Sequence, residues 1–140
     1  MADLSITAAS VLASANCAPT KQYLAGATIT QGALVYLDPT LSVWKLTDAD
    51  AASTGNLSNS RIGIALVGAA NNQPMDVAER DVFFTPGATL TNGIAYYASR
   101  NAGAICPVAD VGAGNYATFV GIARTTAILN LNPTAAGVVV

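Results

Sequence analysis

Residues 25–36 of the chain read AGATITQGALVY, and residues 86–97 read PGATLTNGIAYY. The same pattern therefore occurs twice, 61 positions apart. In each copy, Thr residues alternate with aliphatic residues, a turn containing Gly follows, and an apolar run ends the segment. A second pair of similar segments lies downstream, RIGIAL at 61–66 and FVGIAR at 119–124. Strand-like alternation around a Gly turn predicts a β-hairpin, and its recurrence predicts a scaffold of two similar halves.

Short strands are also expected along the rest of the chain. Apolar or alternating runs of about four to seven residues recur, separated by turns rich in Gly, Pro, Asn and Asp, and no helical periodicity extends over about 11 residues. The sequence therefore predicts an all-β fold, a small β-barrel or sandwich built from two similar β-hairpin-containing halves with an extended N-terminal arm. We divide it into an N-terminal arm or first strand (1–20), a single β domain (21–133) containing the repeat (25–77 and 86–131), and an apolar C-terminal tail (134–140).

The chain is poor in charge for its hydrophobic content. Hydrophobic residues make up 52% of it and charged residues 10%, against about 25% charged residues in an ordinary soluble domain. No charged side chain occurs between Asp3 and Lys21, between Lys21 and Asp38, or after Arg124. Because a monomer normally keeps itself soluble with a dense, mixed-charge surface, we expect both ends of this chain to pack against other subunits.

The charge pattern also excludes two classes of partner. The formal net charge is −2 and the six cations stand singly, whereas nucleic-acid binding needs clustered Lys and Arg to displace phosphate counterions. The longest uncharged segment, 4–20, is interrupted by Ser, Thr, Asn and Pro and falls short of the roughly 20 apolar residues of a membrane span. The N-terminus lacks the basic and continuous apolar regions of a signal peptide, so we expect synthesis and folding in a cytoplasm.

No catalytic, metal-binding or cofactor-binding residues are predicted. The chain has no His, and a Ser or Cys nucleophile needs a neighbouring base, for which only the isolated Lys21 and Lys45 or a carboxylate remain. The segment Asp48-Ala49-Asp50 resembles the start of a calcium loop but lacks the Gly and Glu that follow there, so we interpret it as a solvated turn. The recurring Gly pairs precede strands rather than helices, which argues against a phosphate-binding loop.

The remaining polar and aromatic features are assigned structural roles. Glu79-Arg80-Asp81 is the one charge cluster, which we interpret as a solvated bend or an intersubunit ion pair. Cys17 and Cys106 are interpreted as small buried hydrophobic residues in a reducing compartment rather than as a disulfide. In the pairs Phe83-Phe84 and Tyr96-Tyr97, strand alternation predicts that one ring enters the core while its neighbour faces outward.

Six segments follow one another in an order that carries a family resemblance. They are MADLSIT at 1–7, AGATITQGALVYLD at 25–38, WKLTDADA at 44–51, IGIA at 62–65, GAICPVAD at 103–110 and LNLNP at 129–133. In these segments the chain resembles small bacteriophage head proteins of the capsid decoration, or cement, family. The resemblance covers about residues 20–133 and lies in fold-forming rather than reactive residues. It implies a β-rich domain, commonly a homotrimer, that sits on the lattice of the major capsid protein without cofactors or catalytic residues.

The function implied by this resemblance is structural. We expect a protein that is made in the cytoplasm of the host bacterium, binds the outside of a phage capsid in the virion, and stabilises the head through many identical contacts. Two alternatives remain open. One is another virion component, such as a head-fibre base, tail or adaptor protein. The other is a carbohydrate-binding or adhesin β-domain, which needs exposed aromatic rings. The candidates are Trp44, Tyr36, Tyr97 and Tyr116, although a residue such as Trp44 is more often part of the core or a contact anchor than a ligand platform. An enzyme is not expected.

Overall fold

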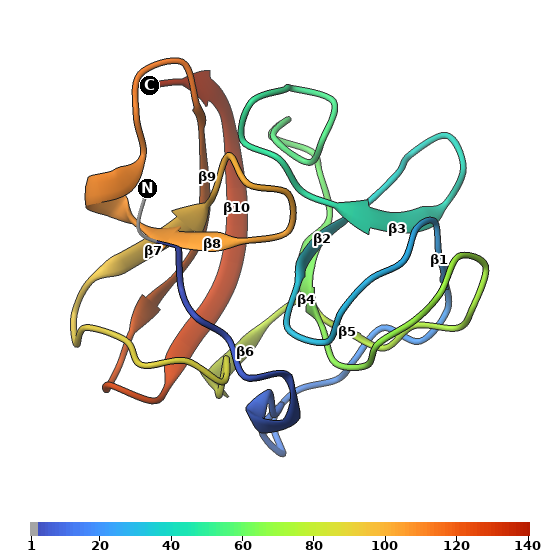
Figure 1. Ribbon diagram of the computed structural model, residues 1–140, viewed down its shortest axis with the longest axis horizontal. Coiled ribbons are helices and arrows are strands. Elements are labelled where there is room, and N and C mark those ends of the chain that lie inside the picture. The colour runs from blue at the N-terminus through green and yellow to red at the C-terminus, as the bar shows by residue number, and fades with distance from the viewer. Residues whose placement is uncertain (1–2) are drawn as a thin grey trace.

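The computed structural model describes residues 3–140 and contains two five-stranded sheets that lie side by side (Figure 1). The predicted all-β fold class is confirmed. The strand order is β1-β3-β2-β4-β5 in the first sheet and β6-β10-β9-β7-β8 in the second. The strands are β1 (Leu24–Ala25), β2 (Leu34–Leu37), β3 (Val43–Leu46), β4 (Ile62–Ala65), β5 (Val77–Ala78), β6 (Asp81–Phe84), β7 (Ala95–Ala98), β8 (Ile105–Pro107), β9 (Tyr116–Ala123) and β10 (Leu129–Val139), and two 3-10 turns are η1 (Ala8–Ser10) and η2 (Val108–Asp110).

Four strands of each sheet share one topology, whereas the fifth strand, β1 or β6, is added at opposite ends. The order β3-β2-β4-β5 in the first sheet matches β8-β7-β9-β10 in the second, and the two copies of the repeated segment lead into β2 and β7. Gly32 and Gly93 precede these strands with φ of 94° and 80°, in the left-handed region that glycine adopts at little cost. The hairpins are β2–β3 and β7–β8. The Thr-rich segment 28–30 forms no strand of its own, and Ile29 instead makes a single bridge to Ala69.

The first sheet curls into a partly closed barrel. The Ala25 N–H donates to the Gln73 carbonyl, and the Asn72 N–H donates to the Ala25 carbonyl, both at 2.8 Å. These bonds join β1 to the segment that leads into β5 and so help to close the barrel. Trp44, which is 0% exposed, lies in the hydrophobic cluster of this barrel.

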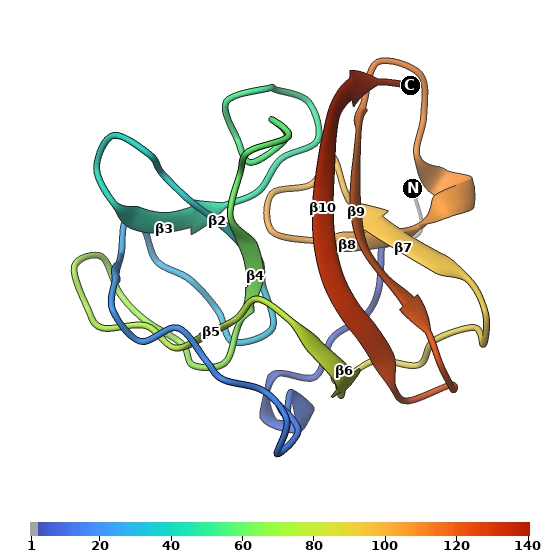
Figure 2. The ribbon, with the colours of Figure 1, turned by 180° about the vertical axis from the view of Figure 1, so that it is seen from behind.

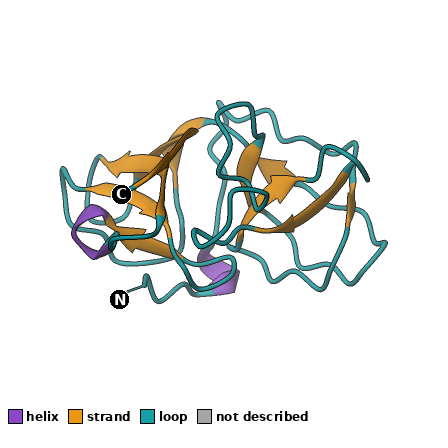
Figure 3. Ribbon diagram, turned by 90° about the horizontal axis from the view of Figure 1, so that it is seen from above, coloured by secondary structure: helices purple, strands orange, loops and turns teal. Residues whose placement is uncertain are grey.

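The main hydrophobic core lies between the two sheets, which Figure 3 shows from above as two groups of strands. Leu34 and Ile64 contribute to it from the first sheet, and Phe84, Leu129 and Leu131 from the second. Because β4 borders the barrel cluster on one face and this core on the other, all four of its residues are buried. Burial on both faces explains why its sequence, IGIA, shows no alternation of polar and apolar residues.

The N-terminal segment covers strand edges. Residues 3–20 contain no strand, but the Leu4 N–H donates to the Ile105 carbonyl at 2.8 Å beside β8, and Leu12 and Thr85 exchange two backbone bonds of 2.9 Å beside β6. Thr20 and Val77 exchange a further pair at β5, of 2.8 and 3.0 Å. An uncovered edge is a template for pairing with other chains. The segment therefore protects both edges of the second sheet and the β5 edge of the first.

The C-terminal residues extend the second sheet. The sequence predicts an apolar tail over 134–140 outside the β domain, but β10 continues to Val139 and stays paired with β9 (Figure 2). The register shifts between Leu131 and Thr134. Because Pro133 falls within this bulge, the ladder does not need the N–H that proline lacks, and the strand passes through it.

Candidate functional site

The outer face of the second sheet carries a row of exposed apolar side chains. Ile122 of β9 pairs directly with Ala95 of β7 and with Asn130 of β10, and direct cross-strand partners lie on the same face of a sheet. At the β6 edge, Phe83 is 46% exposed, and Ile122 itself is 45% exposed. The Arg124 guanidinium lies over the Phe83 ring, 4.8 Å from its centroid.

A second row continues this surface along β7 and β9. Tyr97 pairs with Phe119, and their rings meet edge to face with centroids 5.7 Å apart. Both rings are partly exposed. We call the surface formed by Phe83, Ala95, Tyr97, Phe119 and Ile122 the outer apolar face.

The packing of the two sheets accounts for the exposure of Ile122. In the sequence repeat, Ile122 corresponds to Ile64, which is 1% exposed. The two residues have equivalent cross-strand partners, Leu34 for Ile64 and Ala95 for Ile122, so the register is the same at this point. Ile64 belongs to the core between the sheets, where the second sheet covers it, whereas Ile122 is not part of that core. The same motif therefore buries its isoleucine in the first sheet and exposes it in the second.

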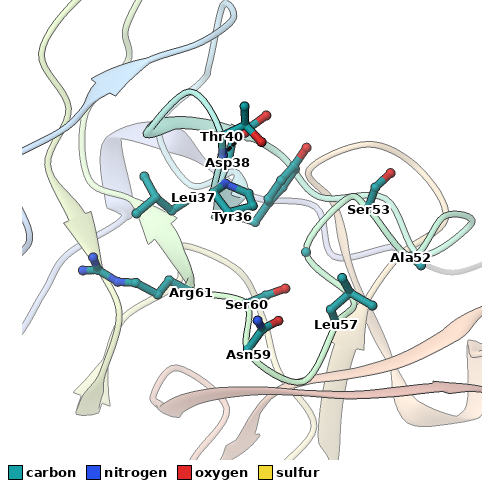
Figure 4. Close-up of a pocket in the computed structure, with 12 residues that line it drawn as sticks. Tyr36, Leu37, Asp38, Thr40, Ala52, Ser53, Leu57, Asn59, Ser60 and Arg61 are labelled. Carbon is teal, nitrogen blue, oxygen red and sulfur yellow. Dashed lines mark hydrogen bonds between the residues drawn. The ribbon is translucent and has the colours of Figure 1, made fainter.

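A cavity of about 360 Å³ opens near the end of β2 in the first half, and Figure 4 shows the side chains around it. It lies between the β2–β3 turn and the loop 52–60. Its apolar wall includes Leu37, Pro39 and Leu57, and its polar groups include Tyr36, Asp38, Ser53, Asn59, Ser60 and Arg61.

The two charged groups of the cavity already have partners. Asp38 accepts hydrogen bonds from the N–H groups of Leu41 (3.0 Å) and Thr40 (2.8 Å) and pairs with Lys45 (3.0 Å). The Leu41 N–H, followed by Lys45 and the Thr40 N–H, lowers the pKa of the Asp38 carboxyl. Arg61 makes two bonds to Glu79, of 3.0 and 2.7 Å. Both charged side chains of the cavity, Asp38 and Arg61, are therefore engaged in contacts within the chain.

The other charged segments considered as candidate sites, 48–50 and 79–81, contain side chains that stabilise the fold. Asp48 accepts the Asp50 N–H at 3.0 Å, as in a capped turn, and within residues 3–140 no three His, Cys, Asp or Glu side chains gather as metal ligands would. In the 79–81 cluster, the expected solvated bend or intersubunit pair is wrong for two members. Glu79 pairs with Arg61 of its own chain, and Asp81 is only 2% exposed.

The predictions for the cysteines and paired aromatics can be compared with the structure. Cys17 and Cys106 are both free; Cys106 is buried as expected, and Cys17 is half-buried. Phe84 and Tyr96 lie in the core while Phe83 and Tyr97 face outward, which confirms the predicted alternation. Trp44 is a core residue.

Comparison with protein-family models, curated proteins and solved structures gives no significant match. Across residues 3–140, no helix has the length and hydropathy needed to cross a membrane. The outer apolar face is the candidate functional surface that sequence reasoning does not find. Its signal lies in the exposed partners of the Phe and Tyr pairs, but the exposure of Ile122 depends on how the two sheets pack, which the repeat does not encode.

Proposed function

We propose that the protein is a structural virion component that binds the outside of a phage capsid lattice and stabilises the head. The observation that carries this proposal is the outer apolar face, where Phe83 and Ile122 stay exposed on a rigid sheet. Exposed apolar surface on a sheet is typical of a protein–protein contact. The family resemblance supplies the kind of partner, the major capsid protein.

The proposed mechanism is mechanical. Each copy contributes a modest contact, and copies joined as a homotrimer bind several neighbouring capsid subunits at once, so that the assembly holds far more tightly than one contact would. The low charge of the chain suits this role because few ions must be desolvated when the surface is covered. A shell closed by many such contacts resists the pressure of packaged DNA.

The carbohydrate-binding alternative loses two of its four candidate rings, those of Trp44 and Tyr36. Trp44 is enclosed in the barrel of the first sheet and cannot stack on a sugar ring. Tyr36 is 7% exposed and so offers little ring surface. We therefore propose no lectin function, and keep glycan binding and the other virion roles as outcomes of the test.

The test mixes purified protein with undecorated capsids and measures binding by co-sedimentation. We expect saturable, stoichiometric binding, and a higher temperature of capsid disruption in the decorated shells. Ile122→Asp and Phe83→Ser should each weaken binding at least tenfold. The first would bury a carboxylate at the contact without a partner, and the second would remove the exposed ring from the contact.

Leu41→Asp provides the matched control. Leu41 is also an exposed apolar residue, at 62%, but it lies on the β2–β3 turn of the first half. Its replacement should leave capsid binding unchanged. Binding on a glycan array together with no binding to shells would overturn the proposal, and so would equal losses from all three variants.

A further inference from the structure

The first part of the N-terminal segment, residues 3–13, completes the core without belonging to either sheet; we call it the arm. Leu4, Ile6 and Ala13 pack against the core between the sheets, and Val11 is part of that core. In Figure 1 the dark-blue arm passes from β8 to β6. It has no regular structure beyond the single turn of η1, so its conformation is fixed by what it lies against.

The rest of the chain forms a seat shaped for this arm, made by Gly32, Asp81, Thr85, Gly87 and Ile105; we call it the arm seat. A Cβ on Gly32 would lie 2.7 Å from Cγ2 of Ile6, and a Cβ on Gly87 would lie 2.6 Å from the carbonyl oxygen of Thr7. The two copies of the repeat thus each contribute one glycine against which the arm packs. Neither position has room for a side chain while the arm is in place.

The arm seat also contains a buried acid that takes two of its three hydrogen bonds from Ser14, the residue directly after the arm, and the third from the Phe83 N–H at 3.1 Å. Asp81 is 2% exposed and accepts hydrogen bonds from the Ser14 N–H (2.7 Å) and the Ser14 hydroxyl (2.5 Å). A buried carboxylate without donors is costly. Removal of the arm together with Ser14 would therefore leave this carboxylate with the Phe83 N–H alone.

A linker, residues 14–19, joins the arm to the rest of the chain. It contains more residues than are needed to span the distance between its two anchored ends. Its ends are anchored at Asp81 by Ser14 and, through Thr20, at Val77, and these two anchors are only four residues apart in the chain. The linker folds into a turn, with the Cys17 N–H donating to the Ser14 carbonyl at 3.1 Å. Ala15, Asn16 and Ala18 are exposed, so opening this turn disrupts little packing.

We infer that, when copies of this chain associate, the arm of one copy occupies the arm seat of its neighbour. Extending the six steps from Ser14 to Thr20 gives a reach of roughly 20 Å, and every contact between arm and seat is reproduced in the exchanged form. Association places the neighbour's seat at a high effective concentration. The inference concerns contacts between copies and does not depend on capsid binding.

The experiment uses two chains that each carry one new cysteine, Leu12→Cys in the first and Thr85→Cys in the second. Directly opposed residues of an antiparallel pair have Cα atoms about 5.5 Å apart, which is within disulfide range. Both chains also carry Cys17→Ser, and they have tags of different size. The chains are refolded together, concentrated and oxidised. Because neither chain can close its own disulfide, arm exchange predicts a major mixed covalent pair on non-reducing electrophoresis.

Two further pairs make the result interpretable. Asp3→Cys with Asn101→Cys repeats the test at the start of the arm, where the side chains meet on the surface at 2.6 Å, in case the first pair does not fold. Ile122→Cys with Asn130→Cys, placed on separate chains, is the control, because both residues lie within one sheet away from the arm. This control should give no mixed pair.

The inference is overturned if the separated arm pairs give no mixed disulfide while the same two substitutions within one chain give an internal one. It is also overturned if light scattering shows only monomer at every concentration. Failure of capsid binding leaves these outcomes unchanged, so the two proposals are tested separately.

Discussion

Thr118 on β9 donates a hydrogen bond from its hydroxyl to Oδ1 of Asn56 in the loop of the other half, at 2.5 Å, with both side chains fully buried. Nδ2 of Asn56 donates in turn to the carbonyls of Asp48 and Ala51, both at 2.6 Å. One side chain thus fixes the loop 48–56 and connects it to the second sheet. Because all of its polar atoms are satisfied, this buried group joins the halves rather than weakening the core.

Replacing Asn56 with Ala should lower the free energy of unfolding by about 2–4 kcal/mol, because three hydrogen bonds are lost and the Thr118 hydroxyl is left buried without an acceptor. Thr118→Val should cost less, about 1–2 kcal/mol, since only one bond is lost. Urea unfolding followed by the fluorescence of Trp44, the single tryptophan, measures both. Fully additive costs in the double variant would contradict a direct coupling of the two residues.

The sequence predicts the strands of this fold better than it predicts their exposure. The repeat correctly placed β2 and β7, since a Gly turn and an apolar run are local features. Whether one face of a sheet is covered depends on how the two sheets pack, so the sequence does not distinguish Ile122 from Ile64. Likewise, the barrel of the first sheet depends on a contact between Ala25 and Gln73, which local patterns do not contain.

Glycines of the arm seat should tolerate alanine less well than a glycine elsewhere in the repeat. Gly32, Gly87 and Gly93 all have positive φ, but only the first two would place a Cβ against the arm, and Gly93 has no atom within 4 Å. Gly93→Ala should therefore cost only the backbone term of about 1–2 kcal/mol, whereas Gly32→Ala and Gly87→Ala should cost at least about 1 kcal/mol more. Urea midpoints, together with the rate of proteolysis of the arm, check this. Equal losses in the free energy of unfolding at all three positions would show that the arm does not pack closely against the arm seat.

Acid should destabilise the protein partly through Glu79. Burial opposes ionisation of this carboxyl, but hydrogen bonds from Arg61 and Thr20 outweigh burial, so the pKa of Glu79 lies below its ordinary value. A depressed folded-state pKa contributes stability above the unfolded value of about 4.3, and this contribution is lost as the pH falls through the folded value. Glu79→Gln should therefore be less stable than the parent at pH 7, and the difference should shrink toward pH 3.

Asp50→Asn is the control for that titration, because Asp50 is exposed and lies 4.0 Å from Arg100. Its stability should follow the parent protein across the same pH range. Thermal unfolding at half-unit pH steps makes the comparison. A Glu79→Gln variant whose deficit stays constant from pH 7 to pH 3 would show that the ion pair with Arg61 is not the source of the acid sensitivity.

The two free cysteines should differ in their reaction with a maleimide. Burial raises the pKa of the Cys106 thiol to about 11, with Asp3 and Asp110 acting in the same direction, and no part of the residue is exposed. Because the thiolate is the reactive form, Cys106 should stay unlabelled at pH 8 in the native protein. Burial, and to a lesser extent the charge of Asp81, also raises the pKa of the Cys17 thiol. This half-buried thiol should therefore react, but more slowly than in urea.

Intact-mass spectrometry over time counts the adducts. One slow adduct in buffer and two fast ones in urea are expected, with Cys106→Ala keeping the slow adduct; labelling of Cys106 in buffer at its rate in urea would mean that β8 opens readily.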